Sequence, residues 1–233
     1  PPHGFVPAET IEKALLDKES AFRFLDGHCE VEAERLRSEG RVLESFQPVE
    51  SAHDPDAVRR ALQVPEVTLW GYSYGTHLAQ CAAKIMPEGI ERIILCGFEG
   101  PDQTLKLPSN VQAQINKLDS AYAHQTGAPT GSLIQTLDEA IKRLDASPMV
   151  VEVEVAGSAV SLVVGGWGLK MILGSWMGLS NRFVWIPRLC ESIVRGESTE
   201  LAKAARLHAK GWTRTAAFYL HDGASGATGN RIE

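Results

Sequence analysis

Ser73 is the residue whose type and setting best fit covalent chemistry. Residues 71–75 read GYSYG, which matches the pattern G-x-S-x-G. A serine in this pattern acts as a nucleophile when a tight strand-to-helix turn lifts its hydroxyl above the edge of a sheet. A helix that starts behind it favours developing negative charge through its dipole and its N–H groups. We therefore expect Ser73 to be a nucleophile and the backbone N–H of Tyr74 to donate to an oxyanion.

The segments around Ser73 predict the turn that this chemistry needs. The apolar run 67–71 is typical of a buried strand, and residues 76–86 form a weakly charged helical pattern. A second buried strand is expected over 90–98, and an earlier helix is expected to start at Asp54, which precedes a proline. This alternation indicates a parallel sheet covered on both faces, and hence an α/β fold. The alternative is an ordinary turn serine in such a unit.

The pattern changes after residue 101. Residues 9–40 show the apolar spacing of a helix. After residue 101 the same spacing predicts two further helices, which Ser109 and Ser132 can cap. Alternating apolar and polar residues over 149–164 predict a β-hairpin. The expected organisation has three parts: an α/β core portion over 1–101, a mainly helical cap with one hairpin over 102–213, and a returning strand with a Gly-rich tail over 214–233.

Composition narrows the class of protein. The net charge is −6, with 23 Lys and Arg residues that do not cluster, so nucleic acid is not an expected partner. Hydrophobic residues make up 44% of the chain, enough for a globular core. No apolar stretch is long enough to span a membrane, and the first ten residues do not resemble a signal peptide. We therefore expect no membrane partner, and the compartment stays open.

The four cysteines do not predict a metal or redox site. No two of them form a CxxC pair, so neither a metal nor another cofactor is expected. Cys81 and Cys96 lie in apolar patterns typical of small buried side chains. Whether Cys29 and Cys190 form a disulfide is left open by the sequence.

The motif around Ser73 resembles the elbow of the α/β-hydrolase superfamily. LWGYSYGTHLA (69–79) is similar to the elbow of the proline iminopeptidase and tripeptidyl aminopeptidase group of serine peptidases. IERIILCGFEGP (90–101) resembles the strand after which that group's chain leaves the sheet for a cap, and LDASP (144–148) resembles part of the cap. The resemblance implies a partial parallel sheet of α/β-hydrolase type with a helical cap insertion.

The same resemblance implies a Ser, Asp and His triad in that chain order, of which only Ser73 finds a match. No histidine follows His221, and no GxxDxxxP stretch or HGG-type oxyanion loop is found. His77 lies one helical turn after the serine and is expected to pack or cap. His221 and Asp222 are adjacent and cannot complete the family order. We therefore expect this chain by itself to have little or no hydrolase activity.

The cap predicts a substrate class only by resemblance. Its bulky apolar residues either line a substrate pocket or form the core of the cap; they are Trp167, Met171, Trp176, Met177, Phe183 and Trp185. Glu191, Glu197 and Glu200 are candidates to recognise a free peptide N-terminus. The expected function is a serine hydrolase that releases N-terminal residues from small peptides. The alternatives are an esterase or lipase-like enzyme, or a catalytically dead remnant that binds a ligand. The oligomeric state stays open.

Overall fold

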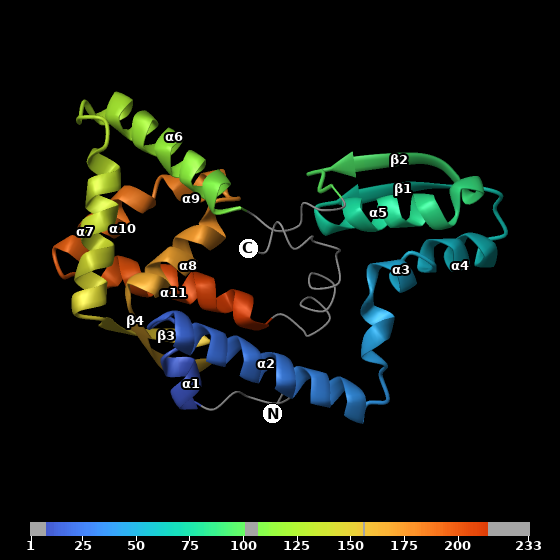
Figure 1. The fold of residues 1–233 in the computed structure, drawn as a ribbon, viewed down its shortest axis with the longest axis horizontal. Coiled ribbons are helices and arrows are strands. Elements are labelled where there is room, and N and C mark those ends of the chain that lie inside the picture. Colours follow the sequence, from blue (N-terminus) through green and yellow to red (C-terminus); the bar gives the residue numbers. More distant parts are fainter. Residues whose placement is uncertain (1–7, 101–106, 156, 214–233) are drawn as a thin grey trace. The chain divides into compact units, whose positions relative to one another are not determined.

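The computed structural model describes residues 8–100, 107–155 and 157–213 (Figure 1). They form a mixed α/β structure that is mostly helical, with two small sheets. The chain divides into two compact units. Unit 1 comprises the described residues of Pro1–Glu32 and Pro108–Arg214, and unit 2 comprises those of Ala33–Leu107. The strand and tail predicted over 214–233, with His221 and Asp222, lie outside the described residues.

Unit 2 contains the segment around Ser73. Its elements are η1 Leu43–Phe46, α3 Pro48–Ser51, α4 Asp54–Ala61, β1 Val67–Tyr72, α5 Tyr74–Ile85, η2 Pro87–Gly89 and β2 Ile90–Cys96. The predicted order of helix, strand, helix and strand is confirmed. Strands β1 and β2 pair in parallel, with Trp70 opposite Ile94 and Tyr72 opposite Cys96.

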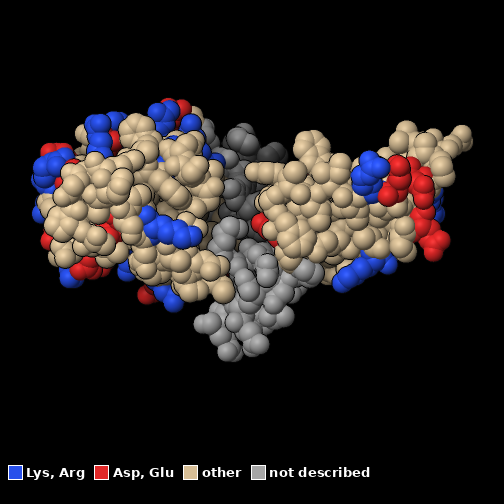
Figure 2. Space-filling view, turned by 90° about the horizontal axis from the view of Figure 1, so that it is seen from above, with Lys and Arg blue, Asp and Glu red and all other residues tan. Residues whose placement is uncertain are grey.

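Helix α5 covers one face of this two-stranded sheet. Ala82 of the helix and Met86, which directly follows it, are buried, and Leu69 of β1 packs against them. On the other face Trp70 is 76% exposed, Tyr72 73% and Ile94 46%. Figure 2 shows the β1–β2 side of this unit as a mainly uncharged surface, with most of its charged residues toward one end. The prediction of a sheet covered on both faces is therefore wrong for the described residues, because alternate strand residues point away from α5.

Unit 1 is built from helices around a β-hairpin. Its elements are α1 Ala8–Glu12, α2 Lys18–Ser38 (whose last turns belong to unit 2), α6 Pro108–Thr126, α7 Ser132–Ala146, β3 Met149–Val155, β4 Ser158–Val164, α8 Gly166–Trp176, α9 Ser180–Phe183, α10 Ile186–Val194, α11 Thr199–Ala209 and η3 Lys210–Thr213. The predicted hairpin is confirmed: β3 and β4 are antiparallel, and Val155 pairs with Ser158. Gly157 in the turn has φ 82°, a conformation that glycine adopts without strain.

The first described residues, from 8 onward, pack within unit 1. Leu15 is fully buried, its carbonyl accepts a hydrogen bond from Gly165 N at 2.9 Å, and it forms a bridge with Val164 of β4. The resulting core brings together side chains from α1, α2, α7, β3, β4, α8, α10 and α11. Residues 8–32, which the sequence grouped with the α/β core portion, thus contribute to the helical unit.

The N-terminus of α7 is capped from a distance. The buried Asp119 carboxylate on α6 accepts hydrogen bonds from the N–H groups of Gly131, Leu133 and Ile134 at 2.6, 3.0 and 3.3 Å. Ser132, the predicted cap, is already the first helical residue and makes no capping bond. That prediction is wrong because a carboxylate from the neighbouring helix occupies the position of the cap. Ser109 likewise lies inside α6, which begins at Pro108.

Candidate active site

Ser73 forms the single-residue joint between β1 and α5. Its backbone has φ 51° and ψ −124°, a combination that side-chain-bearing residues rarely adopt. Holding such a residue there costs about 1–3 kcal/mol, and the surrounding structure must impose it. The predicted tight turn from strand to helix is therefore present, and Ser73 has the strained backbone that an elbow serine requires.

Close backbone packing imposes this turn. A Cβ on Gly71 would lie 2.4 Å from the carbonyl oxygen of Gly75, so only glycine fits at position 71. The N–H of Ser73 donates to the Cys96 carbonyl at 3.0 Å, which extends the β1–β2 ladder by one bond. The Ser73 carbonyl accepts from the backbone N–H of Thr76 at 2.8 Å and from Thr76 Oγ1 at 2.7 Å. Both sides of the joint are thus held by hydrogen bonds.

The Ser73 side chain is exposed and faces a carboxylate. Its Oγ lies 3.4 Å from Oε1 of Glu99, which follows β2 by three residues. Among the described residues no imidazole makes a hydrogen bond to this hydroxyl. The structure thus brings Glu99 to Ser73 from the end of the neighbouring strand.

The backbone of Glu99 is held in place by the first turns of α5. Its N–H donates to Thr76 Oγ1 at 2.9 Å, and its carbonyl accepts from Gln80 Nε2 at 2.8 Å. The same Gln80 amide donates to the Thr76 carbonyl at 3.0 Å. Sequence reasoning assigned no role to Glu99. A signal was available: the carboxyl ends of adjacent parallel strands meet at one sheet edge, so the acid after β2 lies near the residue after β1.

Tyr74 is the first residue of α5, as the oxyanion prediction requires. N–H groups in the first turn of a helix have no acceptor within that helix and point out of its N-terminus. The Tyr74 N–H therefore belongs to the positive end of α5, directly after the serine. Its role as an oxyanion donor stays a prediction.

His77 is 5% exposed and lies on the buried side of α5. Its ring stacks on that of Tyr74 with centroids 6.0 Å apart. The Nδ1 atom is buried and has no hydrogen-bond partner among the described residues. This placement agrees with the packing role expected from the sequence.

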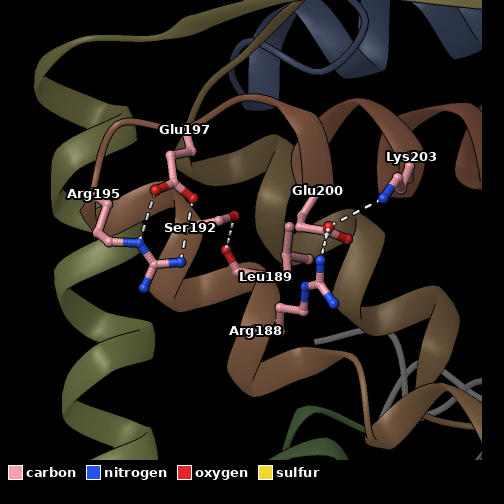
Figure 3. A network of polar contacts seen from close by, with 7 residues as sticks. All are labelled: Arg188, Leu189, Ser192, Arg195, Glu197, Glu200 and Lys203. Carbon is pink, nitrogen blue, oxygen red and sulfur yellow. Dashed lines mark hydrogen bonds and ion pairs between the residues drawn. The ribbon is translucent and has the colours of Figure 1, made fainter.

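The three carboxylates proposed for recognising a peptide N-terminus lie in unit 1. Figure 3 shows two of them, Glu197 and Glu200, with their basic partners. Glu197 accepts from Nε and Nη2 of Arg195 at 2.9 and 3.2 Å. Glu200 lies 2.9 Å from Arg188 Nη2 and 3.1 Å from Lys203 Nζ. The hydrogen bond from Lys203 lowers the pKa of Glu200, and the bond from Arg195 lowers that of Glu197.

Glu191, the third of these acids, accepts a hydrogen bond from the Tyr122 hydroxyl at 3.3 Å. Arg195 Nη1 also lies 3.8 Å from its carboxylate. All three acids therefore have partners within unit 1. The contacts of Glu191 with Tyr122 and of Glu200 with Arg188 join helices, whereas Glu197 pairs with the nearby Arg195.

Two of the bulky apolar residues predicted to line a substrate pocket, Trp176 and Trp185, line a hollow in unit 1. It has a volume of about 240 Å³ and is lined by Trp176, Arg182, Trp185, Leu189, Glu200, Lys203, Ala204 and Leu207. Trp176 is also part of the buried core. This residue therefore both lines a hollow and belongs to the core, the two alternatives that the sequence left open. A larger open hollow of about 780 Å³ lies beside α2. Ser73 lines neither of these two hollows.

The described residues contain no cluster of side chains that could bind a metal ion. No three His, Cys, Asp or Glu side chains of these residues converge to hold an ion. All four cysteines are free thiols, so Cys29 and Cys190 do not pair. Burial raises the pKa of Cys190 to about 12.

No described helix has both the length and the apolar character needed to cross a bilayer.

Comparison with known proteins finds one kind of partial similarity. The chain is similar to a serine protease. Over 120 residues it is 28% identical to the serine protease Hip1 of Mycobacterium tuberculosis and, equally, to that of Mycobacterium bovis. The match covers 46% of this chain and 23% of each relative, so it spans less than a quarter of these curated proteins. No family model matches the chain.

Proposed function

We propose that this chain belongs to a peptidase-type serine hydrolase of the α/β-hydrolase fold, with Ser73 as the nucleophile. The observation that carries the proposal is the strained backbone of Ser73, at φ 51° and ψ −124°, between a parallel strand and a helix. Strain of this kind persists where the surroundings impose it, and it is concentrated at functional sites. An ordinary turn serine has no need of it.

The surroundings of Ser73 support this role electrostatically. The hydroxyl stands at the N-terminus of α5, where the helix dipole stabilises negative charge that develops during attack. The N–H of Tyr74 is positioned in sequence to donate to the oxyanion. The partial similarity to a serine protease supports peptide or ester carbonyls as the reacting group.

The proposed reaction proceeds through an acyl-enzyme. Ser73 Oγ attacks the scissile carbonyl carbon and loses its proton to a base, the C–N or C–O bond breaks, and the leaving group departs with a proton. Water then hydrolyses the ester on Ser73. Because no described imidazole makes a hydrogen bond to Ser73 Oγ, we expect slow turnover by the 233-residue chain alone. By resemblance to the proline iminopeptidase group, we propose the release of N-terminal residues from small peptides.

Labelling with a fluorophosphonate probe tests the nucleophile directly. We expect the full-length protein to be labelled at Ser73, as located by peptide mass spectrometry, and Ser73→Ala to be silent. Ser45→Ala is the matched control, because Ser45 is an exposed serine of the same unit whose hydroxyl only bonds to the Val42 carbonyl at 2.6 Å. A protein that is never labelled at Ser73 contradicts the proposal and favours a ligand-binding remnant.

A substrate panel separates the remaining alternatives. Aminoacyl-naphthylamides report release of an N-terminal residue, and short nitrophenyl esters report esterase activity. We expect hydrolysis of the amides, proline among them, that depends on Ser73. Turnover confined to the esters contradicts the peptidase assignment while leaving the nucleophile in place.

A further inference from the structure

The carboxylate of Glu99 stands beside the proposed nucleophile, with Oε1 3.4 Å from Ser73 Oγ. The backbone N–H and carbonyl of Glu99 are both tied to α5, through Thr76 Oγ1 and Gln80 Nε2. Its position relative to the serine is therefore set by the same helix that sets the elbow. A negative charge held next to the attacking atom disfavours an alkoxide, so its benefit is expected elsewhere in the reaction.

The geometry of attack places the amine of an N-terminal residue in the same region. The carbonyl carbon must come within about 3–3.5 Å of Ser73 Oγ before it reacts. In a substrate whose first residue is cleaved off, the α-nitrogen is two bonds from that carbon. An α-ammonium therefore lies a few ångströms from groups that flank the hydroxyl, and Glu99 is such a group.

The acids of unit 1 have other contacts. Glu197 is held by Arg195, and Glu200 by Arg188 and Lys203. Recruiting either acid for a substrate ammonium would mean giving up these ion pairs, of which Arg188–Glu200 joins α10 to α11. Glu99 lies in the same unit as Ser73 and contacts its hydroxyl.

We propose that Glu99 binds the free α-ammonium group of the substrate and so makes the enzyme selective for unblocked N-termini. This inference rests on the proposed function of Ser73. It assigns Glu99 as a specificity-determining residue.

The test compares free and blocked substrates on the full-length protein. Glu99→Gln keeps the size of the side chain and removes its charge. Since a hydrogen bond to a charged group is worth more than a neutral one, we expect kcat/KM for a free aminoacyl-naphthylamide to fall about 10- to 100-fold. For the N-acetylated analogue we expect no more than about a twofold change, because that substrate has no charge to lose. Glu99→Asp, which retains the charge, should keep a measurable preference for the free amine.

Glu91→Gln is the matched control. Glu91 Oε2 lies 3.4 Å from Thr68 Oγ1, so this variant alters a similar carboxylate–hydroxyl pair of the same unit, near the start of β2. We expect it to leave both substrates unaffected. Fluorophosphonate labelling of Ser73, which needs no amine, should persist in Glu99→Gln.

Four results would overturn the inference. An equal loss on free and blocked substrates, or loss of labelling in Glu99→Gln, shows that Glu99 acts on Ser73 rather than on the ammonium. Unchanged selectivity in Glu99→Gln shows that the ammonium is held elsewhere, with the hydrolase function intact. Absence of any Ser73-dependent hydrolysis of either substrate overturns the proposed function, and the inference with it.

Discussion

The two sheets of this protein have opposite surroundings. In unit 1 the β3–β4 hairpin contributes Val151, Leu162 and Val164 to a core in which each is at most 3% exposed, and α1, α8 and α11 pack against its strands. In unit 2 the β1–β2 sheet has α5 on one face, while Trp70 and Ile94 are exposed on the other. The sheet that carries Ser73 thus belongs to the unit with the smaller buried core.

This difference teaches which features of an elbow are local. The turn at Ser73 depends on contacts within residues 71–80 and with residues 96–99. None of these contacts needs the second face of the sheet. Parallel sheets are ordinarily buried on both faces, and an exposed apolar face promotes association. Backbone strain at Ser73 and burial of the sheet are therefore separate properties. A substitution can change one of them without changing the other.

The largest expected effect compares one aliphatic residue from each sheet. Leu162→Ala removes a fully buried side chain of β4 and should destabilise unit 1 by about 3 kcal/mol, through lost burial and a cavity. Ile94→Ala alters a 46% exposed side chain of β2 and should cost about 1 kcal/mol or less. Hydrogen exchange of peptides from each unit measures both changes. Similar losses at the two positions would mean that the exposed face of β1–β2 is covered in solution.

The elbow glycines allow a second matched pair. Gly71→Ala places a Cβ 2.4 Å from the Gly75 carbonyl, so the turn must shift, at a cost of about 2–3 kcal/mol. Gly75→Ala meets nothing within 4 Å and lies in α5, where alanine should stabilise by about 0.5–1 kcal/mol. Urea unfolding measures stability, and fluorophosphonate labelling should be lost in Gly71→Ala alone. Undiminished labelling of Gly71→Ala would show that the turn tolerates a wider geometry.

Removing the Asp119 carboxylate, which caps α7 from the neighbouring helix α6, should have a smaller effect on stability. Asp119→Ala leaves the N–H groups of Gly131, Leu133 and Ile134 without their carboxylate and should cost about 2 kcal/mol. Asp119→Asn retains one acceptor oxygen and should cost less. Because the three bonds lie within unit 1, labelling of Ser73 should be unchanged in both variants. An equal cost for Ala and Asn would show that the charge, rather than the hydrogen bonds, stabilises α7.

The sequence predicted the features that depend on neighbouring residues. The elbow follows from glycine spacing between a strand and a helix, and the β3–β4 hairpin follows from alternation around a glycine. Their determinants lie within about ten residues of one another, where local chemistry decides the backbone. Fold class follows in turn, because a strand–helix–strand order already implies parallel pairing.

Features that depend on distant residues were missed or wrongly assigned. Asp119 caps a helix twelve positions along the chain, so Ser132 looked like the better candidate from sequence alone. Glu99 reaches Ser73 only because β1 and β2 pair in register. Glu200 looked like a candidate for substrate binding because its partner Arg188 lies on another helix and cannot be identified by spacing. Long-range pairing of side chains is decided by packing, which single-sequence patterns do not encode.

The smallest expected effect separates strain from function at one residue. Ser73→Gly removes the Cβ that disfavours φ 51° and ψ −124°, and should stabilise unit 2 by about 1 kcal/mol after the entropy cost of glycine is subtracted. Ser73→Ala removes the same hydroxyl but keeps the Cβ, and should give no such gain. Comparing the two by urea unfolding isolates the backbone term, because both lose the contact with Glu99. If Ser73→Gly is no more stable than Ser73→Ala, the elbow stores no strain, and the observation on which the nucleophile assignment rests loses its force.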